Sequence, residues 1–430
     1  MRIFKKLGPG RIISLGFAAV ILLGAFLLWL PISANEGVHV SLIDALFTST
    51  SAVCVTGLIA VDTADTFNLF GQIVVAALIQ IGGLGVTSIG VGFIILAGKK
   101  VGIKSRILVR EAMNLDSLGG IVKLVKAILL MTLTFESIGA FLSFITFSKD
   151  YPFIQAVWIS IFHSIAAFNN SGFDILGGLQ NLIPYQNNVL LNLTTCGLII
   201  FGGLGFLVIL DIMKKRSFKK LTLHSKVVIV TSVFLLIVGT IGIKCTENIT
   251  WLGAFFNSTS ARTAGFSTFP LGQFSNATLF ILIILMFVGA SPGSTGGGIK
   301  TTTAYILFKH VVSIAKNKNC STFKREISQD TITKANIILL LGLLVVVFVT
   351  LSITILQPEF SFIHILTEVT SAFGTVGLSA GITTHLHVIS KLLIILTMFI
   401  GRLGPLTIAS LWSFNEKSGV HYSKETITIG

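Results

Sequence analysis

The sequence predicts an all-helical protein that crosses a membrane several times, and three observations point to this fold class. Of its 430 residues, 53% are hydrophobic and only 11% are charged, whereas a typical soluble domain has about 25% charged residues. The mean hydropathy is +0.91. Long apolar runs recur along the chain, with shorter apolar segments between them. Disordered, coiled-coil and ordinary soluble enzyme classes are therefore excluded.

Eight apolar runs are candidate transmembrane helices, because each offers about 20 mostly apolar residues. The first run does not end in the small residues of a cleavage site and is followed by further spans. We therefore interpret it as a retained helix and not as a signal peptide. The runs lie near residues 11–33, 70–97, 127–147, 188–213, 227–243, 277–315, 335–356 and 389–412, and the sixth is interrupted.

The positions of the basic residues predict the orientation of these spans. Most of the 31 Lys and Arg residues lie near the N-terminus, in the stretches 98–126, 214–226 and 309–334, and in the tail. Basic loops stay on the cytoplasmic side of a membrane. Both termini are therefore predicted to be cytoplasmic. The net charge of +14 indicates topology, and it does not indicate nucleic acid binding.

Four shorter apolar segments are predicted to enter the membrane and turn back, because each is too short to cross it. Each ends near a glycine, and small residues precede that glycine by five and six positions in all four segments. The segments are 41–58, 157–173, 251–266 and 362–378, and their glycines are Gly57, Gly172, Gly265 and Gly377.

The chain is thus predicted to contain four parallel repeats of helix, half-helix, glycine loop and helix, with eight transmembrane helices and four re-entrant pore helices around one central pore. A second glycine motif recurs at 82–85, 202–205 and 401–404. Close helix packing is one explanation for this motif, and it stays open here. The repeats span residues 1–97, 98–213, 214–316 and 317–430, and the last includes the tail.

A glycine loop at membrane depth must line a water-filled path or be buried in protein. Its carbonyl oxygens can replace the water shell of an ion, and the half-helix before it directs the negative end of its dipole inward, which favours a cation. Four such loops predict a cation filter of main-chain oxygens. The predicted filter residues are Val55, Thr56, Gly57, Asn170, Ser171, Gly172, Thr263, Ala264, Gly265, Thr375, Val376 and Gly377.

The interruption of the sixth span cannot form a stable helix, because it contains proline and several glycines and no bulky side chain. We expect a hinge or a loop just inside the filter, with a passive kink as the alternative. The local likeness to a phosphate-binding loop fails, since an extra isoleucine precedes the lysine and no strand precedes the motif. The interruption comprises Ser291, Pro292, Gly293, Ser294, Thr295, Gly296, Gly297 and Gly298.

Charged residues at membrane depth are costly and usually face protein or water. Arg402 is predicted to point into the pore below the filter, where either its charge opposes a permeating cation or its donors hold carbonyls of the 291–298 segment. A structural bond to a neighbouring helix end is the alternative. Arg262 is predicted to brace the filter from behind. Glu368 is expected to pair either with Arg262 or with a filter amide, and Asp44 to cap its helix.

These motifs resemble those of the Trk/Ktr/HKT superfamily of potassium transporters, and most closely its KtrB-type membrane subunit. The resemblance implies four covalently linked, channel-like repeats around one pore, with the four glycines in the filter and the 291–298 segment and Arg402 at the gate. It is carried by LPIS at 30–33, IDALFTSTSAVCVTGL at 43–58, LIQIGGLG at 78–85, AFNNSGF at 167–173, ARTAGF at 261–266, MFVGASPGSTGGGIK at 286–300, AFGTVGL at 372–378 and MFIGRLGPLT at 398–407.

The resemblance also implies a substrate and partners. Some plant members that transport sodium have serine at the first filter position, so Gly57 favours K⁺, with Na⁺ as a candidate activator. A homodimer in the bacterial cell membrane and a cytoplasmic ring of KtrA-type subunits that bind ATP or ADP are implied as well. The alternative is a secondary transporter, such as a Na⁺/K⁺ symporter with alternating access. That class predicts inverted repeats and acidic pairs, whereas the repeats here are parallel. No constellation suggests an enzyme.

Overall fold

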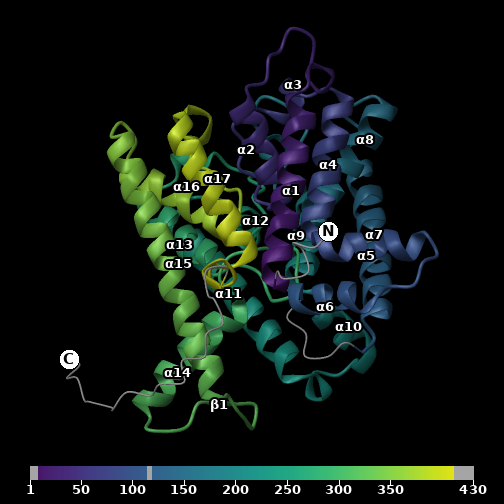
Figure 1. Cartoon of the computed structure of the whole chain (residues 1–430). Coiled ribbons are helices and arrows are strands. Elements are labelled where there is room, and N and C mark those ends of the chain that lie inside the picture. Colours follow the sequence, from purple (N-terminus) through teal and green to yellow (C-terminus); the bar gives the residue numbers. More distant parts are fainter. Residues whose placement is uncertain (1–7, 114–118, 411–430) are drawn as a thin grey trace.

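The structure is a computed structural model that describes residues 8–113 and 119–410 (Figure 1). The predicted cytoplasmic ends at 1–7 and 411–430 lie outside the described residues. Within the described ranges the fold is helical, apart from one hairpin in which β1 (Ser321–Thr322) pairs antiparallel with β2 (Arg325–Glu326). A long helix, a short helix and a broken helix follow one another four times along the chain.

The long helices open each of these units. Among the described residues, only these four opening helices are individually long and apolar enough to cross a membrane. They are α1 (Pro9–Trp29), α7 (Ile121–Phe147), α11 (Leu223–Thr246) and α15 (Gln329–Leu356).

The short helices coincide with the predicted re-entrant segments. Three of them begin at a hydroxyl residue whose side chain accepts a hydrogen bond from the main-chain N–H group three positions later: Ser41, Thr250 and Ser361. Such N-caps stabilise a helix start by about 1 kcal/mol. The short helices are α2 (Leu42–Val53), α8 (Phe153–Phe168), α12 (Trp251–Ser260) and α16 (Phe362–Gly374).

The third helix of each unit is broken, whereas the sequence predicts an interruption only in the third unit. The first two breaks bend the chain by 101° and 95°. Each of these two bent pairs, α4 (Leu69–Leu84) with α5 (Val86–Leu96) and α9 (Val189–Leu204) with α10 (Phe206–Lys215), qualifies as one membrane span only when its two parts are taken together. The other two broken helices are α13 (Asn276–Phe287) with α14 (Thr301–Ala315), and α17 (Val388–Leu403) with α18 (Pro405–Ser410).

Short helical turns connect these elements. Two of the connections are α-helical: α3 (Thr63–Thr66) lies within the first unit, and α6 (Ile103–Ala112) lies between α5 and α7. The others are 3-10 turns: η2 (Pro31–Ser33), η3 (Ile183–Tyr185), η4 (Phe218–Lys220), η5 (Leu271–Gln273) and η6 (Thr383–His385).

A repeated glycine and serine contact fixes three of the short helices against the long helix before them. In the first unit the Oγ atom of Ser49 donates to the carbonyl of Ile21 at 2.7 Å, and a Cβ atom on Gly24 would overlap that hydroxyl. The same contact joins Ser164 to α7 beside Gly139. It also joins Ser258 to α11 beside Gly239. The small residue lets the helices approach closely, and the hydroxyl sets their register.

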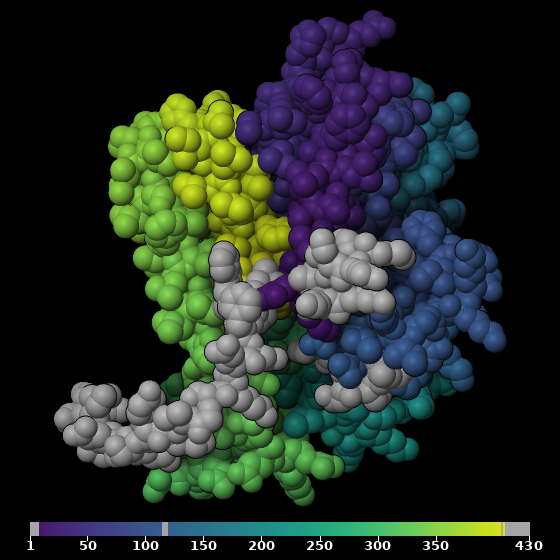
Figure 2. Space-filling model, in the orientation of Figure 1, coloured from purple at the N-terminus to yellow at the C-terminus, as the bar shows by residue number. Residues whose placement is uncertain are grey.

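The last unit lies beside the first. Figure 2 shows α17 (yellow) next to the N-terminal residues (purple), and α17 contacts α2. Lys391 and Asp44 form an ion pair at 2.7 Å across this junction. Asp44 also accepts a hydrogen bond from Ser41 Oγ at the start of α2. It therefore contacts the start of its own helix, as expected, and also links the first unit to the last.

Candidate functional site

The four predicted filter glycines meet in the interior as a closed ring, which we call the glycine ring. A Cβ atom built on each glycine would lie 2.9 or 3.0 Å from the Cα atom of the next one. It would also lie 2.2 to 2.7 Å from a carbonyl oxygen of that neighbouring loop, and real Cβ atoms essentially never come within 3.0 Å of such an atom. Every position of the ring therefore requires glycine. The order of contact is Gly57, Gly172, Gly265, Gly377 and back to Gly57.

The backbone of the four loops repeats the same unusual conformation. Besides the glycine, the residue two positions earlier has a positive φ angle in every loop, and three of those residues are β-branched. This region is strained for β-branched side chains, and strain of this kind gathers at functional sites. The φ angles are 51° at Val55, 59° at Asn170, 74° at Thr263 and 50° at Thr375.

The loops turn their N–H groups away from the ring. The residue just before each glycine donates its N–H to a carbonyl of the preceding short helix or its end, at 2.8 or 2.9 Å. The carbonyl oxygens of the same residues accept no hydrogen bond from any described residue. Each of these oxygens is also the atom nearest to a Cβ built on the adjacent ring glycine. The ring thus presents oxygen atoms without competing donors. These residues are Thr56, Ser171, Ala264 and Val376.

Small residues before the glycines also hold the loops. Ser51 Oγ accepts from the N–H of Gly57 at 3.0 Å, and Ser371 Oγ accepts from the N–H of Gly377 at 3.0 Å. Ser260 Oγ donates to the carbonyl of the residue after Gly265. The alignment of small residues in the sequence therefore marks space and hydroxyl groups behind the filter loops.

A cavity of about 380 Å³ opens on one side of the glycine ring. All four ring glycines line it, together with amide and hydroxyl side chains such as Asn181, Gln273 and Thr383. None of its lining residues is charged. An ion that reaches the ring from this side therefore meets neutral dipoles, and the main-chain oxygens provide the strongest polar groups.

On the other side of the ring, the 291–298 segment forms a buried loop, which we call the intramembrane loop. Gly289 donates its N–H to the carbonyl of Ile299 at 2.8 Å, so the two ends of the loop lie side by side. The N–H of Ser291 donates to the carbonyl of Gly203 at 3.1 Å, and the N–H of Gly298 donates to the carbonyl of Gly401 at 3.2 Å. The loop is therefore held mainly by main-chain hydrogen bonds to other units.

Two cations also hold the intramembrane loop. The Nη1 atom of Arg402 donates to the carbonyl of Thr295, and its Nη2 atom donates to Gly82 and Gly83 of the first unit. Lys300 Nζ donates to the carbonyl of Gly296 at 2.7 Å. Arg402 thus links the last unit, the loop and the first unit, while Lys300 binds the loop itself.

The other predicted charge contacts differ in part from the sequence interpretation. Arg262 is buried and donates to the carbonyl of Ser232 on α11 at 3.1 Å. The expected pairing of Arg262 with Glu368 is wrong. Glu368 instead accepts from the N–H of Ala380 at 2.9 Å and from the hydroxyl of Thr383 at 2.8 Å, because its helix directs it toward the chain just beyond the last filter loop.

A polar contact between the first two units was not anticipated. Glu136 on α7 accepts from Asn169 Nδ2 at 3.0 Å and from Gln80 Nε2 at 3.3 Å. Asn169 is the residue directly before a filter loop, and Gln80 lies on α4. A carboxylate at membrane depth was the only sequence signal for this contact.

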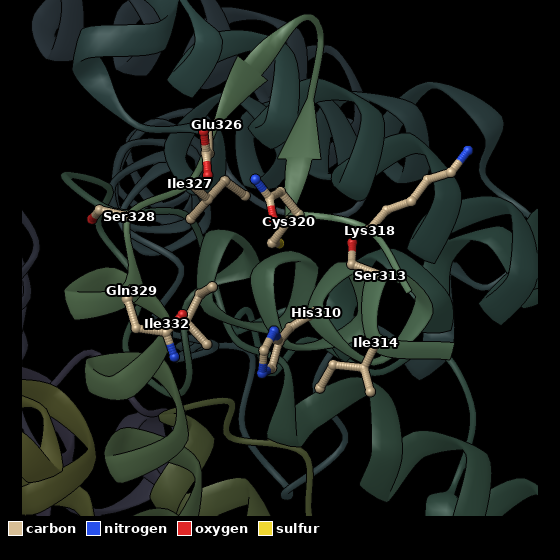
Figure 3. A pocket seen from close by; sticks show the side chains of 11 residues that line it. His310, Ser313, Ile314, Lys318, Cys320, Glu326, Ile327, Ser328, Gln329 and Ile332 are labelled. Atoms are coloured by element: carbon tan, nitrogen blue, oxygen red, sulfur yellow. The ribbon is translucent and has the colours of Figure 1, made fainter. Parts of the chain in front are cut away.

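A second cavity, lined by no residue of the four glycine loops, lies between α14, the β1–β2 hairpin and the start of α15 (Figure 3). Its volume is about 490 Å³, and its lining includes His310, Lys318, Cys320 and Glu326. No group of three or more His, Cys, Asp or Glu residues within 8–113 and 119–410 is arranged to hold a metal ion.

Comparisons with known proteins agree with this geometry. The model of the TrkH family, described as "Cation transport protein", matches residues 11–419. The chain belongs to this family. It is 40% identical to the potassium/sodium uptake protein NtpJ of Enterococcus hirae, over all of this chain and 99% of the relative. It is 37% identical to the Ktr system potassium uptake protein B of Bacillus subtilis, over 98% of this chain and 97% of the relative.

A solved structure shares the fold. The potassium transporter TrkH from Vibrio parahaemolyticus superposes with a TM-score of 0.73 at 18% sequence identity, over 95% of this chain and 86% of that one. The chain is thus a multi-pass membrane protein of a cation transporter family and not an enzyme. The family resemblance expected from the sequence is confirmed.

Proposed function

We propose that this chain takes up K⁺ across the bacterial cell membrane by channel-like conduction through one central pore that is surrounded by its four repeats. The closed ring of four glycines carries this proposal. Its neighbouring carbonyl oxygens accept no hydrogen bond from the described protein, so they are free to replace the water shell of a cation. Two relatives have names that include potassium uptake, which supports K⁺ as the ion.

The intramembrane loop is proposed as the gate of this pore. It lies next to the filter loops, since a Cβ atom on Gly296 would overlap the hydroxyl of Thr263. Its anchors are main-chain hydrogen bonds and the cations Arg402 and Lys300, and these hydrogen bonds can be exchanged for bonds to water when the loop moves. Conduction would then require displacement of the loop from beneath the ring.

Regulation is proposed to come from a separate chain. The name of one relative places it in a Ktr system, and we propose a homodimer of this chain on a cytoplasmic ring of subunits that bind ATP or ADP. Both termini and the basic loops would face that ring. Na⁺ is retained as a candidate activator, and no residue is assigned to it. The repeats are proposed to divide at 97/98, 213/214 and 316/317.

Uptake of radioactive Rb⁺ into liposomes that contain the purified chain tests this function. We expect uptake down the Rb⁺ gradient, competition by external K⁺, and stimulation when the cytoplasmic partner and its nucleotide are added. Accumulation against the Rb⁺ gradient that depends on an imposed Na⁺ gradient would instead support the symporter. Absence of uptake under all of these conditions would contradict conduction.

A further inference from the structure

The side chain of one filter residue, Thr375, accepts a hydrogen bond from the main chain of the intramembrane loop. The N–H of Gly297 donates to the Oγ1 atom of Thr375 at 2.9 Å, and this hydrogen bond is buried. Thr375 is the first residue after α16 and has a left-handed backbone, with φ at 50°. Its side chain therefore faces the loop while its main chain belongs to the filter.

The loop is shaped to fit this threonine. A Cβ atom on Gly297 would lie 2.5 Å from Thr375 Oγ1 and 2.8 Å from its Cγ2 atom. It would also lie 3.0 Å from the carbonyl oxygen of Gly401. Residue 297 thus has no room for a side chain, and its N–H group is brought into hydrogen-bonding distance of the hydroxyl.

The other three repeats do not offer this contact. The equivalent residue of the first repeat is Val55, which has no hydroxyl group. Asn170 of the second repeat lies 3.2 Å from the hydroxyl of Thr263, so these two side chains contact each other. Among the described residues, Thr375 alone of the four equivalent residues accepts an N–H of the intramembrane loop.

We propose that Thr375 is a positioning residue that couples the gate to the filter. This inference rests on the function proposed above. The hydroxyl holds the loop in its closed position, and the same residue supplies a main-chain carbonyl at the inner end of the filter. Displacement of the loop breaks the hydrogen bond and frees this strained residue to relax, which changes the filter geometry.

Thr375→Val tests the coupling, because valine keeps the shape and loses only the hydroxyl. Val55 shows that valine is accommodated in this backbone conformation, with φ at 51°. In the liposome assay we expect Rb⁺ uptake without the cytoplasmic partner to rise about three- to tenfold, the range for one buried neutral hydrogen bond. The preference for Rb⁺ over Na⁺ is expected to fall in the same variant.

Two further variants separate coupling from a merely structural role. Thr375→Ser keeps the hydroxyl and is expected to restore wild-type uptake and selectivity. Thr367→Val is the matched control, since its hydroxyl donates only to the carbonyl of Ile363 within the same helix, at 2.7 Å. That control is expected to leave uptake unchanged.

The outcomes distinguish this inference from the proposed function. If the wild-type chain carries Rb⁺ and Thr375→Val matches it or is slower, the coupling is wrong and conduction stands. Faster uptake with wild-type selectivity would also overturn the coupling, because the loop would then move independently of the filter. If the wild-type chain carries no Rb⁺, the proposed function and this inference fail together.

Discussion

The break in the third helix of each unit is built in two different ways. In three units a single glycine makes it, with nearly the same dihedral angles each time: φ and ψ are 84° and 132° at Gly85, 93° and 138° at Gly205, and 88° and 135° at Gly404. In the remaining unit the chain leaves the helix at Phe287 and resumes it only at Thr301.

This difference shows that the bend is needed for the fold, whereas the long connection in the third unit is an addition. One glycine is sufficient to turn the chain at this place, since three units do so in the same conformation. The longer connection is therefore not needed for the bend. It reaches under the glycine ring and makes hydrogen bonds to other units, which is the arrangement expected of a movable obstruction.

Replacement of a ring glycine, a residue that all four repeats share, should have the largest effect on transport. In Gly57→Ser, the Cβ atom would overlap the carbonyl oxygen of Ser171, so the loops must separate. We expect the K⁺ over Na⁺ preference to fall by at least roughly tenfold, which corresponds to about 1.4 kcal/mol in relative affinity. Competition of Na⁺ and K⁺ against Rb⁺ uptake measures this preference.

Gly197→Ala is the matched control for the ring variant, because a Cβ atom there meets no atom within 4 Å and the residue lies within helix α9. Unchanged discrimination in folded Gly57→Ser protein would remove the glycine ring as the selectivity filter.

Removal of the arginine that anchors the intramembrane loop should have the next largest effect on transport. In Arg402→Ala, the hydrogen bonds to Thr295, Gly82 and Gly83 are lost. Bonds from a charged group contribute about 1.5–3 kcal/mol each, so we expect uptake without the partner to rise by roughly tenfold or more. Lower flux from folded protein would argue against a gate.

The glycine hinges should affect stability more than transport. A Cβ atom on Gly85 has almost free space, with its nearest contact at 4.0 Å, but its φ of 84° is one that other residues rarely adopt. We expect Gly85→Ala to lower the free energy of unfolding by about 1–2 kcal/mol. Urea unfolding of the detergent-solubilised protein gives the measurement.

Gly90→Ala provides the comparison, since Gly90 lies within α5, has ordinary helical backbone angles and has no neighbour within 4 Å of a Cβ atom. Alanine there should stabilise the helix by up to about 1 kcal/mol. If both variants changed the free energy of unfolding equally, the positive φ angle of Gly85 would not be the reason that glycine is needed there.

The four loops were predictable from the sequence because their signals are local. A short apolar segment, small residues at fixed spacing and a glycine identify each re-entrant helix, and the four copies reinforce one another. The long helices were predictable from length and hydropathy for the same reason. Arg402 stood out because a cation at membrane depth needs partners.

The bends and pairings were not predictable, because they depend on contacts between units. The glycine motif at 82–85 suggested close packing, and Gly82 does pack against the carbonyl of Val53. The last glycine of this motif, Gly85, instead forms the bend between α4 and α5, and the hydropathy of the sequence does not reveal this bend. Glu368 could not be assigned a partner, since Thr383 and Arg262 are both distant in sequence and only the turn after the filter decides between them.

The smallest expected effect is at Asp174, which follows the ring glycine Gly172 by two residues and is linked to its carbonyl through the side chain of Asn181. Asn181 Nδ2 donates to Asp174 at 2.9 Å and to the carbonyl of Gly172 at 3.1 Å. Burial raises the pKa of Asp174 from an ordinary 3.8 to about 7, and the nearby Asp62 adds to this, against the hydrogen bond from the N–H of Leu176.

The folded protein therefore keeps a proton on Asp174 that the unfolded chain releases between about pH 4 and 7. The folded state binds more protons in this window, so its contribution to stability falls as the pH rises and levels off above 7. In Asp174→Asn, the fall in the melting temperature of the solubilised protein between about pH 4 and 7 should be shallower than in the wild type. If the variant keeps the wild-type slope, the proton belongs to another group, and the second repeat does not differ from the other three in its response to pH.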